Sequence, residues 1–331
     1  MQIAMTRGGR RPAWLLAGFF VVSAPGSADA YMAYVSNERD NTISVVDLDQ
    51  MKTVATVPVG QRPRGITMTR DGREILVCAS DDDTIQIIDA STLRIVGTLP
   101  SGPDPETFAL HVSGNPLYVS NEDDNMVTVI DVPTRKVIAE IATGVEPEGM
   151  AVCPDGKTIV NTSETTNMAH FFDYESRKMV ASVLVDARPR IAMFKHDGSE
   201  VWVSSELGGT VSVVDPQKHV VTHRISFDVQ GLRGDVIQPV GIQFTPDGAT
   251  AFVALGPANR VAIINAKTYE VRKYLLVGQR VWQMAFTPDQ KYLLTTNGLS
   301  NDISVIDVAG SDVVKSIPVG RLPWGVVVSP K

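Results

Sequence analysis

The sequence predicts an all-β fold, a seven-bladed β-propeller with four antiparallel strands in each blade. Seven short apolar segments, each ending in Asp or Asn, recur at intervals of 42 residues, with one interval of 50; they end at Asp47, Asp89, Asp131, Asp173, Asp215, Asn265 and Asp307. No window has a sustained apolar period of about 3.6 residues, which helices would require. Short strands repeated with a period just above forty residues are typical of propellers.

Each repeat contains four strand-like runs. In the second repeat they are 65–69, 74–79, 84–89 and 94–99, which are rich in Val, Ile and Thr and are separated by Gly, Asp and Ser. Such runs predict strands. The acidic residue that ends each third run is expected to cap nearby backbone N–H groups.

The two ends of the repeat region complement each other. Residues 31–36 have the pattern of a second strand, and residues 324–329 have the pattern of a first strand. We therefore expect three N-terminal strands and one C-terminal strand to form one blade. This arrangement closes the ring and leaves no exposed sheet edge between the termini.

The first thirty residues predict a secretory signal peptide. Basic Arg7, Arg10 and Arg11 precede an apolar run at 14–22, and small residues follow up to Ala30. The run is too short to span a bilayer stably, and no later segment predicts a transmembrane span, although an N-terminal anchor remains the alternative. The expected domains are the signal peptide, 1–30, and the propeller, 31–331. The expected location is periplasmic or secreted.

Composition excludes several functional classes. A net charge of −7 argues against nucleic-acid binding, and two cysteines are too few for a disulfide scaffold, a four-cysteine zinc site or an iron–sulfur cluster. We expect Cys78 and Cys153 to be buried free thiols. No C-x-x-C-H or G-x-S-x-G motif is present, so no haem or covalent cofactor is expected and the cofactor stays unknown.

The repeats resemble a known family. The segments YVSNERDNTISVVDL, LYVSNEDDNMVTVIDV and PVGQRPRGITMTRDG are similar to YVTN β-propeller repeats over essentially all of 31–331. With the signal peptide and the segment GxxPEGMAVCPDGKTIV, the chain most resembles the β-propeller proteins associated with PQQ-dependent catabolism. This resemblance implies a periplasmic setting near quinoprotein alcohol oxidation, with a quinoprotein dehydrogenase or a cytochrome as partner. It carries over no catalytic residue.

Two recurring positions at the start of the innermost strands are predicted to surround the channel mouth on the top face. One ring reads Arg64, Glu106, Glu148, Arg190, Val240, Trp282 and Trp324; the other includes Arg62, Asp104, Glu146, Arg188, Gln238 and Arg280. The eight-residue excess at 227–238 is expected to overhang the apolar sector. Aromatic faces beside guanidinium groups predict a site for a small anionic ligand or a partner's loop. The alternative is that the arginines pair with the glutamates and the tryptophans plug the channel.

Acidic residues also recur in the loops between second and third strands: Glu38, Asp81, Glu122, Glu164 and Glu206. We expect these carboxylates to lie too far apart for one metal ion and to form a solvated face that steers a basic partner. A metal site remains the alternative where Asp81, Asp82 and Asp83 cluster.

The preferred function is a non-enzymatic binding or accessory protein. The alternatives are a lactonase-type hydrolase, with Glu106 or Glu148 as base and an arginine at the oxyanion, and a pure protein-interaction scaffold.

Overall fold

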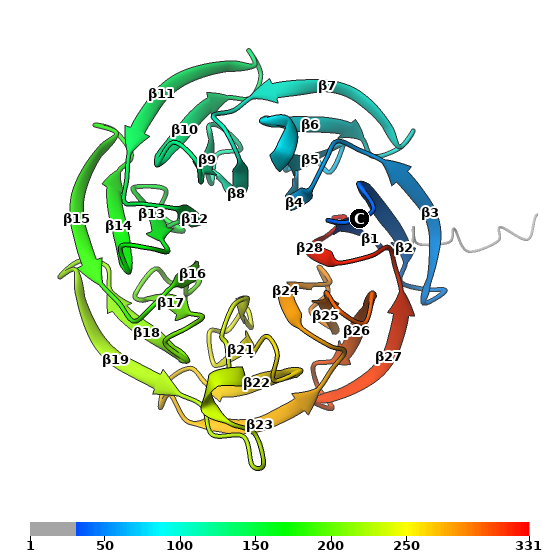
Figure 1. Cartoon of the computed structure of the whole chain (residues 1–331), viewed down its shortest axis with the longest axis vertical. Helices are drawn as coiled ribbons and strands as arrows, with labels where there is room; N and C mark the ends of the chain where they lie inside the picture. The colour runs from blue at the N-terminus through cyan, green and yellow to red at the C-terminus, as the bar shows by residue number, and fades with distance from the viewer. Residues whose placement is uncertain (1–30, 331) are drawn as a thin grey trace, which may run out of the picture.

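The computed structural model describes residues 31–330 as a ring of seven four-stranded antiparallel sheets around a central channel (Figure 1). The predicted seven-bladed propeller is confirmed. The expected signal peptide, 1–30, lies outside the described residues. Among them, the helical elements are two short 3₁₀ turns, η1 (Ser80–Asp82) and η2 (Gly234–Val236), and no helix is long and apolar enough to cross a membrane.

We name each blade by its innermost strand. These strands are β28 (Pro323–Val328), β4 (Pro63–Met68), β8 (Pro105–Leu110), β12 (Pro147–Val152), β16 (Pro189–Phe194), β20 (Ile242–Phe244) and β24 (Val281–Phe286). The second strands, in the same blade order, are β1 (Met32–Asn37), β5 (Glu74–Ala79), β9 (Leu117–Asn121), β13 (Thr158–Ser163), β17 (Val201–Ser205), β21 (Thr250–Ala254) and β25 (Tyr292–Asn297).

The two outer layers follow in the same order. The third strands are β2 (Thr42–Asp47), β6 (Thr84–Asp89), β10 (Met126–Asp131), β14 (Met168–Asp173), β18 (Thr210–Asp215), β22 (Arg260–Asn265) and β26 (Asp302–Asp307). The outer strands are β3 (Lys52–Pro58), β7 (Arg94–Pro100), β11 (Lys136–Ala142), β15 (Lys178–Leu184), β19 (Val220–Ser226), β23 (Val271–Leu276) and β27 (Asp312–Pro318).

The ring closes as predicted. The β28 blade has the order β28-β1-β2-β3, so the last strand of the chain pairs with the first, and these blue and red strands lie together in Figure 1. Each described outer strand also shifts register by one residue against its third strand. Such bulges twist an exposed edge and hinder further strand pairing.

Buried hydroxyl groups connect adjacent blades. Thr162 of β13 accepts a hydrogen bond from Gly149 N–H (2.8 Å) and donates one to the carbonyl of Arg190 in the next blade (2.7 Å). Glycine is required beside it, because a Cβ on Gly149 would lie 2.1 Å from that same carbonyl oxygen. Equivalent hydroxyl bridges come from Ser36, Ser120 and Thr296.

Six of the seven Asp and Asn residues that end the third strands are seen to cap turns, as predicted. Asp89 accepts hydrogen bonds from the N–H groups of Ser91 and Thr92, and Asn265 does the same for Lys267 and Thr268 without a charge. Caps of this kind are also made by Asp47, Asp131, Asp173 and Asp215. Their role is structural.

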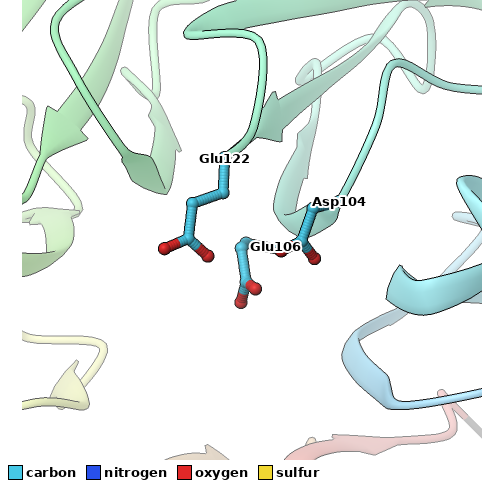
Figure 2. A group of neighbouring side chains, drawn as sticks. All are labelled: Asp104, Glu106 and Glu122. Carbon is cyan, nitrogen blue, oxygen red and sulfur yellow. The ribbon is translucent and has the colours of Figure 1, made fainter.

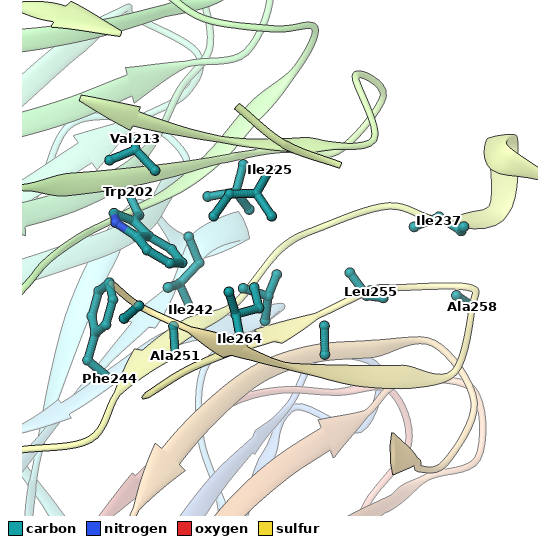
Figure 3. Packing of buried hydrophobic residues seen from close by; sticks show 14 of the residues in the cluster. Trp202, Val213, Ile225, Ile237, Ile242, Phe244, Ala251, Leu255, Ala258 and Ile264 are labelled. Carbon is teal, nitrogen blue, oxygen red and sulfur yellow. The ribbon is translucent and has the colours of Figure 1, made fainter. Parts of the chain in front are cut away.

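The apolar core lies between neighbouring blades. Trp202 and Phe244, from adjacent blades, meet edge to face with ring centroids 4.9 Å apart (Figure 3). Ile237, from the long loop after β19, packs against Leu255 and Ala258 of the β20 blade. The loop at 227–238, which was expected to overhang the apolar sector of the mouth, thus packs through Ile237 against the β20 blade that follows it. The two cysteines, Cys78 and Cys153, are buried and free, as predicted.

Candidate binding site at the channel mouth

The innermost strands all begin at the same end of the ring, which we call the top face. The second residue of each strand, or its equivalent before β20, faces the channel mouth: Trp324, Arg64, Glu106, Glu148, Arg190, Val240 and Trp282. The 42-residue register therefore brings the predicted ring residues together. Most of them are buried; Glu106 is 0% exposed, Glu148 1%, Arg190 4% and Trp324 2%.

Arg64 and Arg62 form the first ion-pair arc. Arg64 pairs with Glu106 of the next blade, and its Nη2 lies 3.2 Å from Glu38 Oε1. Arg62 pairs with Asp104, and its Nη2 lies 3.2 Å from Glu106 Oε1. Charged partners keep the pKa of Arg64 above its ordinary value although burial opposes this. Both arginines are therefore neutralised within the protein.

Arg190 and Arg188 form the second arc. Arg190 Nη2 lies 2.8 Å from Glu148 Oε1, and Arg190 also pairs with Glu164. Arg188 Nε lies 2.8 Å from Glu164 Oε2 and 3.3 Å from Glu206 Oε2. The alternative interpretation of the sequence, in which the mouth arginines pair with Glu106 and Glu148, thus describes the contacts observed.

The tryptophans stack against arginines. The Arg280 guanidinium carbon lies 4.3 Å from the centre of the Trp282 ring, and Arg280 Nη2 lies 2.8 Å from Glu206 Oε1. The guanidinium carbon of Arg64 lies 5.7 Å from the centre of the Trp324 ring. These cation–π contacts hold Trp282 and Trp324 against arginines that also form ion pairs with glutamates. Gln238, at the end of the long loop, accepts a hydrogen bond from Arg280 (3.1 Å).

Carboxylates are more numerous than guanidinium groups at the mouth. Figure 2 shows Glu122, at the end of β9, reaching toward Glu106 and Asp104 of the same blade. Burial and the neighbouring negative charges raise the pKa of Glu122 to about 8. The same causes raise the pKa of Asp104 to about 6. The mouth therefore carries an excess of acid, part of which is protonated near neutral pH.

A groove of about 370 Å³ lies on the top face over the β8, β12 and β16 blades. It is lined by Glu122, Glu146, Glu164, Thr165, Asn167, Ala187, Arg188 and Leu207. Oxygens of its three glutamates lie within 4.8 Å of one another. Two of the loop carboxylates, Glu122 and Glu164 of adjacent repeats, therefore lie closer together than expected, and Glu146 of the second mouth ring completes the group. Three oxygens at this spacing suit a hard cation or an ammonium group.

The local cluster at η1 does not form a separate acidic site. Asp81 Oδ1 lies 2.7 Å from Arg62 Nε, and Asp82 accepts the backbone N–H of Gln61. Asp83 accepts the backbone N–H of Asp104. Each carboxylate therefore already has a partner.

Sequence reasoning gave Glu164 and Glu206 only a solvated role. In the structure each is 4% exposed and binds mouth arginines. A signal was present, because Glu122, Glu164 and Glu206 are 42 residues apart and hold one loop position in three consecutive blades.

Comparisons with known proteins agree with this architecture. Residues 176–328 match the YNCE-like β-propeller family, and residues 17–108 match the cytochrome D1 heme domain. No curated protein matches the chain.

Three solved structures are similar. Kuenenia stuttgartiensis hydrazine synthase has a TM-score of 0.75 at 20% identity, over 83% of this chain and 92% of that one. A functionally unknown protein from Desulfotomaculum acetoxidans has a TM-score of 0.78 at 15% identity, over 90% and 98%. The dihydro-heme d1 dehydrogenase NirN has a TM-score of 0.66 at 16% identity, over 89% and 74%. At these identities the likeness shows the fold, and the chain is a seven-bladed β-propeller that is similar in part to the YNCE-like and cytochrome d1 propellers.

Proposed function

We propose that this propeller is a non-enzymatic docking protein whose top-face groove binds a basic segment of a partner protein. The observation that carries the proposal is the set of three glutamates, Glu122, Glu146 and Glu164, converging in one groove. Arg188 is the one cationic side chain among the groove's described lining residues. A lysine or arginine from a partner would meet carboxylates from adjacent blades, and charge-assisted hydrogen bonds of this kind are strong.

The rim of the groove adds an apolar element. Leu207 lines the groove and is 63% exposed, and Val145, next to Glu146, is 44% exposed. Exposed apolar side chains beside an acidic wall suit a segment in which basic and apolar residues alternate. The partner proposed is therefore amphipathic as well as basic.

The other functions receive less support from the geometry. A small anionic ligand needs free guanidinium groups, and Arg64 and Arg190 are already paired with glutamates. A hydrolase of the kind weighed above needs a base that reaches substrate, and Glu106 and Glu148 are at most 1% exposed.

A haem at the mouth is also poorly supported. Haem iron in proteins is held by His, Cys, Met or Tyr. The mouth ring of Trp, Arg, Glu and Val residues offers none of these. His170, on β14, is enclosed by Gly144 N–H and Ser182, and burial lowers its pKa to about 4. We propose no cofactor. The chain is proposed to act after export, beside a quinoprotein dehydrogenase or a cytochrome; the leader-like pattern of 1–30 and the family resemblance support this setting.

The proposal is tested with two basic peptides, one of alternating Lys and Leu and one of Lys alone. The alternating peptide is expected to bind the parent protein in a salt-dependent manner and more tightly than the lysine peptide. Glu122→Gln with Glu146→Gln is expected to weaken binding at least about tenfold, because each charge-assisted hydrogen bond contributes about 1.5–3 kcal/mol. Isothermal titration calorimetry at two salt concentrations measures this, at pH 9, where Glu122 is ionised and lysine is still charged.

The matched control removes two charges from the opposite end of the ring. Asp49→Asn with Glu175→Gln changes exposed turn residues by the same net charge and should leave binding unchanged. Equal weakening in both double variants would show that general charge, not the groove, attracts the peptide. The competing occupant of the groove is a metal ion. A calcium titration of the parent and of Glu122→Gln/Glu146→Gln tests this, because a metal site would bind calcium and exclude the peptide.

A further inference from the structure

A second cavity lies within the central channel below the mouth ring. It has a volume of about 340 Å³, and residues from all seven innermost strands line it. Most of these are apolar, among them Ile66, Phe108, Ile191 and Val327. A cavity of this size with apolar walls and a few polar groups is typical of small-molecule sites.

The cavity adjoins the buried residues of the mouth ring. Glu106, Glu148, Arg190 and Val240, which precede cavity-lining residues in the chain, are each at most 4% exposed. The ion pairs of Arg64 with Glu106 and of Arg190 with Glu148 join neighbouring blades at this level.

Two side chains that line the cavity carry a hydrogen-bond donor without a partner among residues 31–330. The indole Nε1 of Trp324, on β28, is buried and finds no acceptor in this part of the chain, and Trp324 is 2% exposed. The amide Nε2 of Gln283, on the neighbouring strand β24, is also unpaired. Both residues line the cavity. An unpaired buried donor is costly, so two of them on neighbouring strands indicate an acceptor that residues 31–330 do not supply.

The other walls offer no charge for a ligand. Three methionines, Met150, Met193 and Met284, line the cavity, and their flexible thioethers adapt to irregular apolar shapes. Gln243, the other amide in the wall, donates its Nε2 to the carbonyl of Met284 (2.9 Å). The described lining contains no charged side chain, so a neutral ligand is favoured over a carboxylate or an ammonium ion.

We propose that this channel cavity is a binding site for a small neutral aromatic or aliphatic molecule that carries one hydrogen-bond acceptor, such as a ketone carbonyl. The acceptor lies against Trp324 and Gln283, and the apolar body lies against Phe108 and the methionines. The site is independent of the docking function proposed for the groove, since the two cavities share no lining residue.

The test uses acetophenone as probe and ethylbenzene as its matched compound without an acceptor. With ¹³C-methyl-labelled methionine, the signals of Met150, Met193 and Met284 report binding by NMR, and those of Met51 and Met126, which do not line the cavity, serve as internal references. Acetophenone is expected to shift the three cavity signals saturably and to bind about three- to tenfold more tightly than ethylbenzene, the range for one neutral hydrogen bond.

Two variants separate the polar contact from the cavity itself. Trp324→Phe keeps an aromatic ring and removes the donor, so it should weaken acetophenone by the same factor and leave ethylbenzene unchanged. Gln283→Met removes the other donor and replaces Trp324→Phe in the test if that variant does not fold. It should also weaken acetophenone binding and leave ethylbenzene binding unchanged. Thr67→Phe fills the cavity from β4 and should abolish binding of both compounds.

Three results would overturn the proposal. One is the absence of saturable shifts at the cavity methionines, and another is unchanged binding in Thr67→Phe. The third is equal affinity of the parent protein for acetophenone and ethylbenzene, which would refute the assigned acceptor. A benzoate titration checks the preference for a neutral ligand, and tighter binding of benzoate than of acetophenone would contradict it.

Discussion

Arg190 and Glu148 hold the same position in adjacent repeats, and their side chains pair beneath the channel mouth with Nη2 2.8 Å from Oε1. Arg190 also pairs with Glu164, and its Nη1 lies 3.8 Å from Glu206 Oε2. One buried guanidinium therefore serves three buried carboxylates from two adjacent blades. Burial raises the pKa of Glu148 well above its ordinary value, and Arg190 only partly opposes this effect.

This asymmetry predicts unequal effects of two substitutions. Arg190→Met should lower the free energy of unfolding by about 3–5 kcal/mol, because it leaves buried carboxylates without their partner. Glu148→Gln should cost less than about 1.5 kcal/mol, because it keeps the volume and resembles the protonated form that burial favours. Urea unfolding monitored by fluorescence measures both. Arg321→Met, which breaks a surface pair with Asp40, is the control and should cost under about 1 kcal/mol. Equal losses in the two buried variants would refute this account.

The mouth ring was predictable because a constant 42-residue interval puts equivalent residues at equivalent places around a closed ring. The pairing of Arg64 with Glu106 was foreseen only as an alternative, since sequence gives positions along a strand but not the distance between side chains of neighbouring blades. The convergence of Glu122, Glu146 and Glu164 depends on ring curvature and on loop shape, which the repeat pattern does not contain.

The pKa of Glu122 predicts a specific pH dependence of stability. Its folded-state value of about 8 lies above the ordinary value of about 4.3, so the folded protein binds this proton more tightly than the unfolded chain. The resulting stabilisation is full below the ordinary value and is lost as pH rises through about 8. Glu122→Gln should therefore become more stable relative to the parent between pH 5 and pH 9, by about 1–2 kcal/mol after a discount for solvent screening.

The measurement is urea unfolding of both proteins across that pH range. Asp123→Asn removes a charge from the adjacent exposed residue and should give a difference from the parent that does not change with pH. A constant difference for Glu122→Gln as well would show that Glu122 titrates normally in the folded protein.

Strand positions and ring closure were predictable because alternating apolar residues and turn residues mark them locally. The hydroxyl bridges between blades were not foreseen, since Ser36, Ser120 and Thr162 interrupt apolar runs without forming a motif of their own. Cys78 holds the equivalent position in the β4 blade, where a Cβ on Gly65 would lie 3.3 Å from its Sγ. The Cys78 thiol is buried and free, as predicted. Only the structure shows that it stands where other blades have a bridging hydroxyl group.

Because Thr162 and Cys78 hold the same position in their blades, the hydroxyl bridges predict opposite effects on stability when the two residues are replaced. Thr162→Val keeps the shape and leaves Gly149 N–H and the Arg190 carbonyl unpaired, so it should cost about 1–3 kcal/mol. Cys78→Ser introduces the hydroxyl that the neighbouring blades use, so it should be neutral or stabilising by up to about 1 kcal/mol. Thermal unfolding compares the two. A loss in Cys78→Ser as large as that in Thr162→Val would mean that the β4 blade cannot form the bridge.

The close approach of innermost strands predicts that Gly149 cannot be replaced. A Cβ there would lie 2.1 Å from the Arg190 carbonyl oxygen, and this atom belongs to backbone that Thr162 also holds in place. Gly149→Ala should therefore destabilise the protein by about 3 kcal/mol or more, because adjacent blades must separate. Gly234→Ala is the matched control, since a Cβ on Gly234 in the loop after β19 meets nothing within 4 Å. Urea unfolding should show a large loss for Gly149→Ala and a change within about 0.5 kcal/mol for Gly234→Ala. If Gly149→Ala were as stable as the parent, the blades would have to shift at this contact without cost, and the glycine would not set the spacing between β12 and β16.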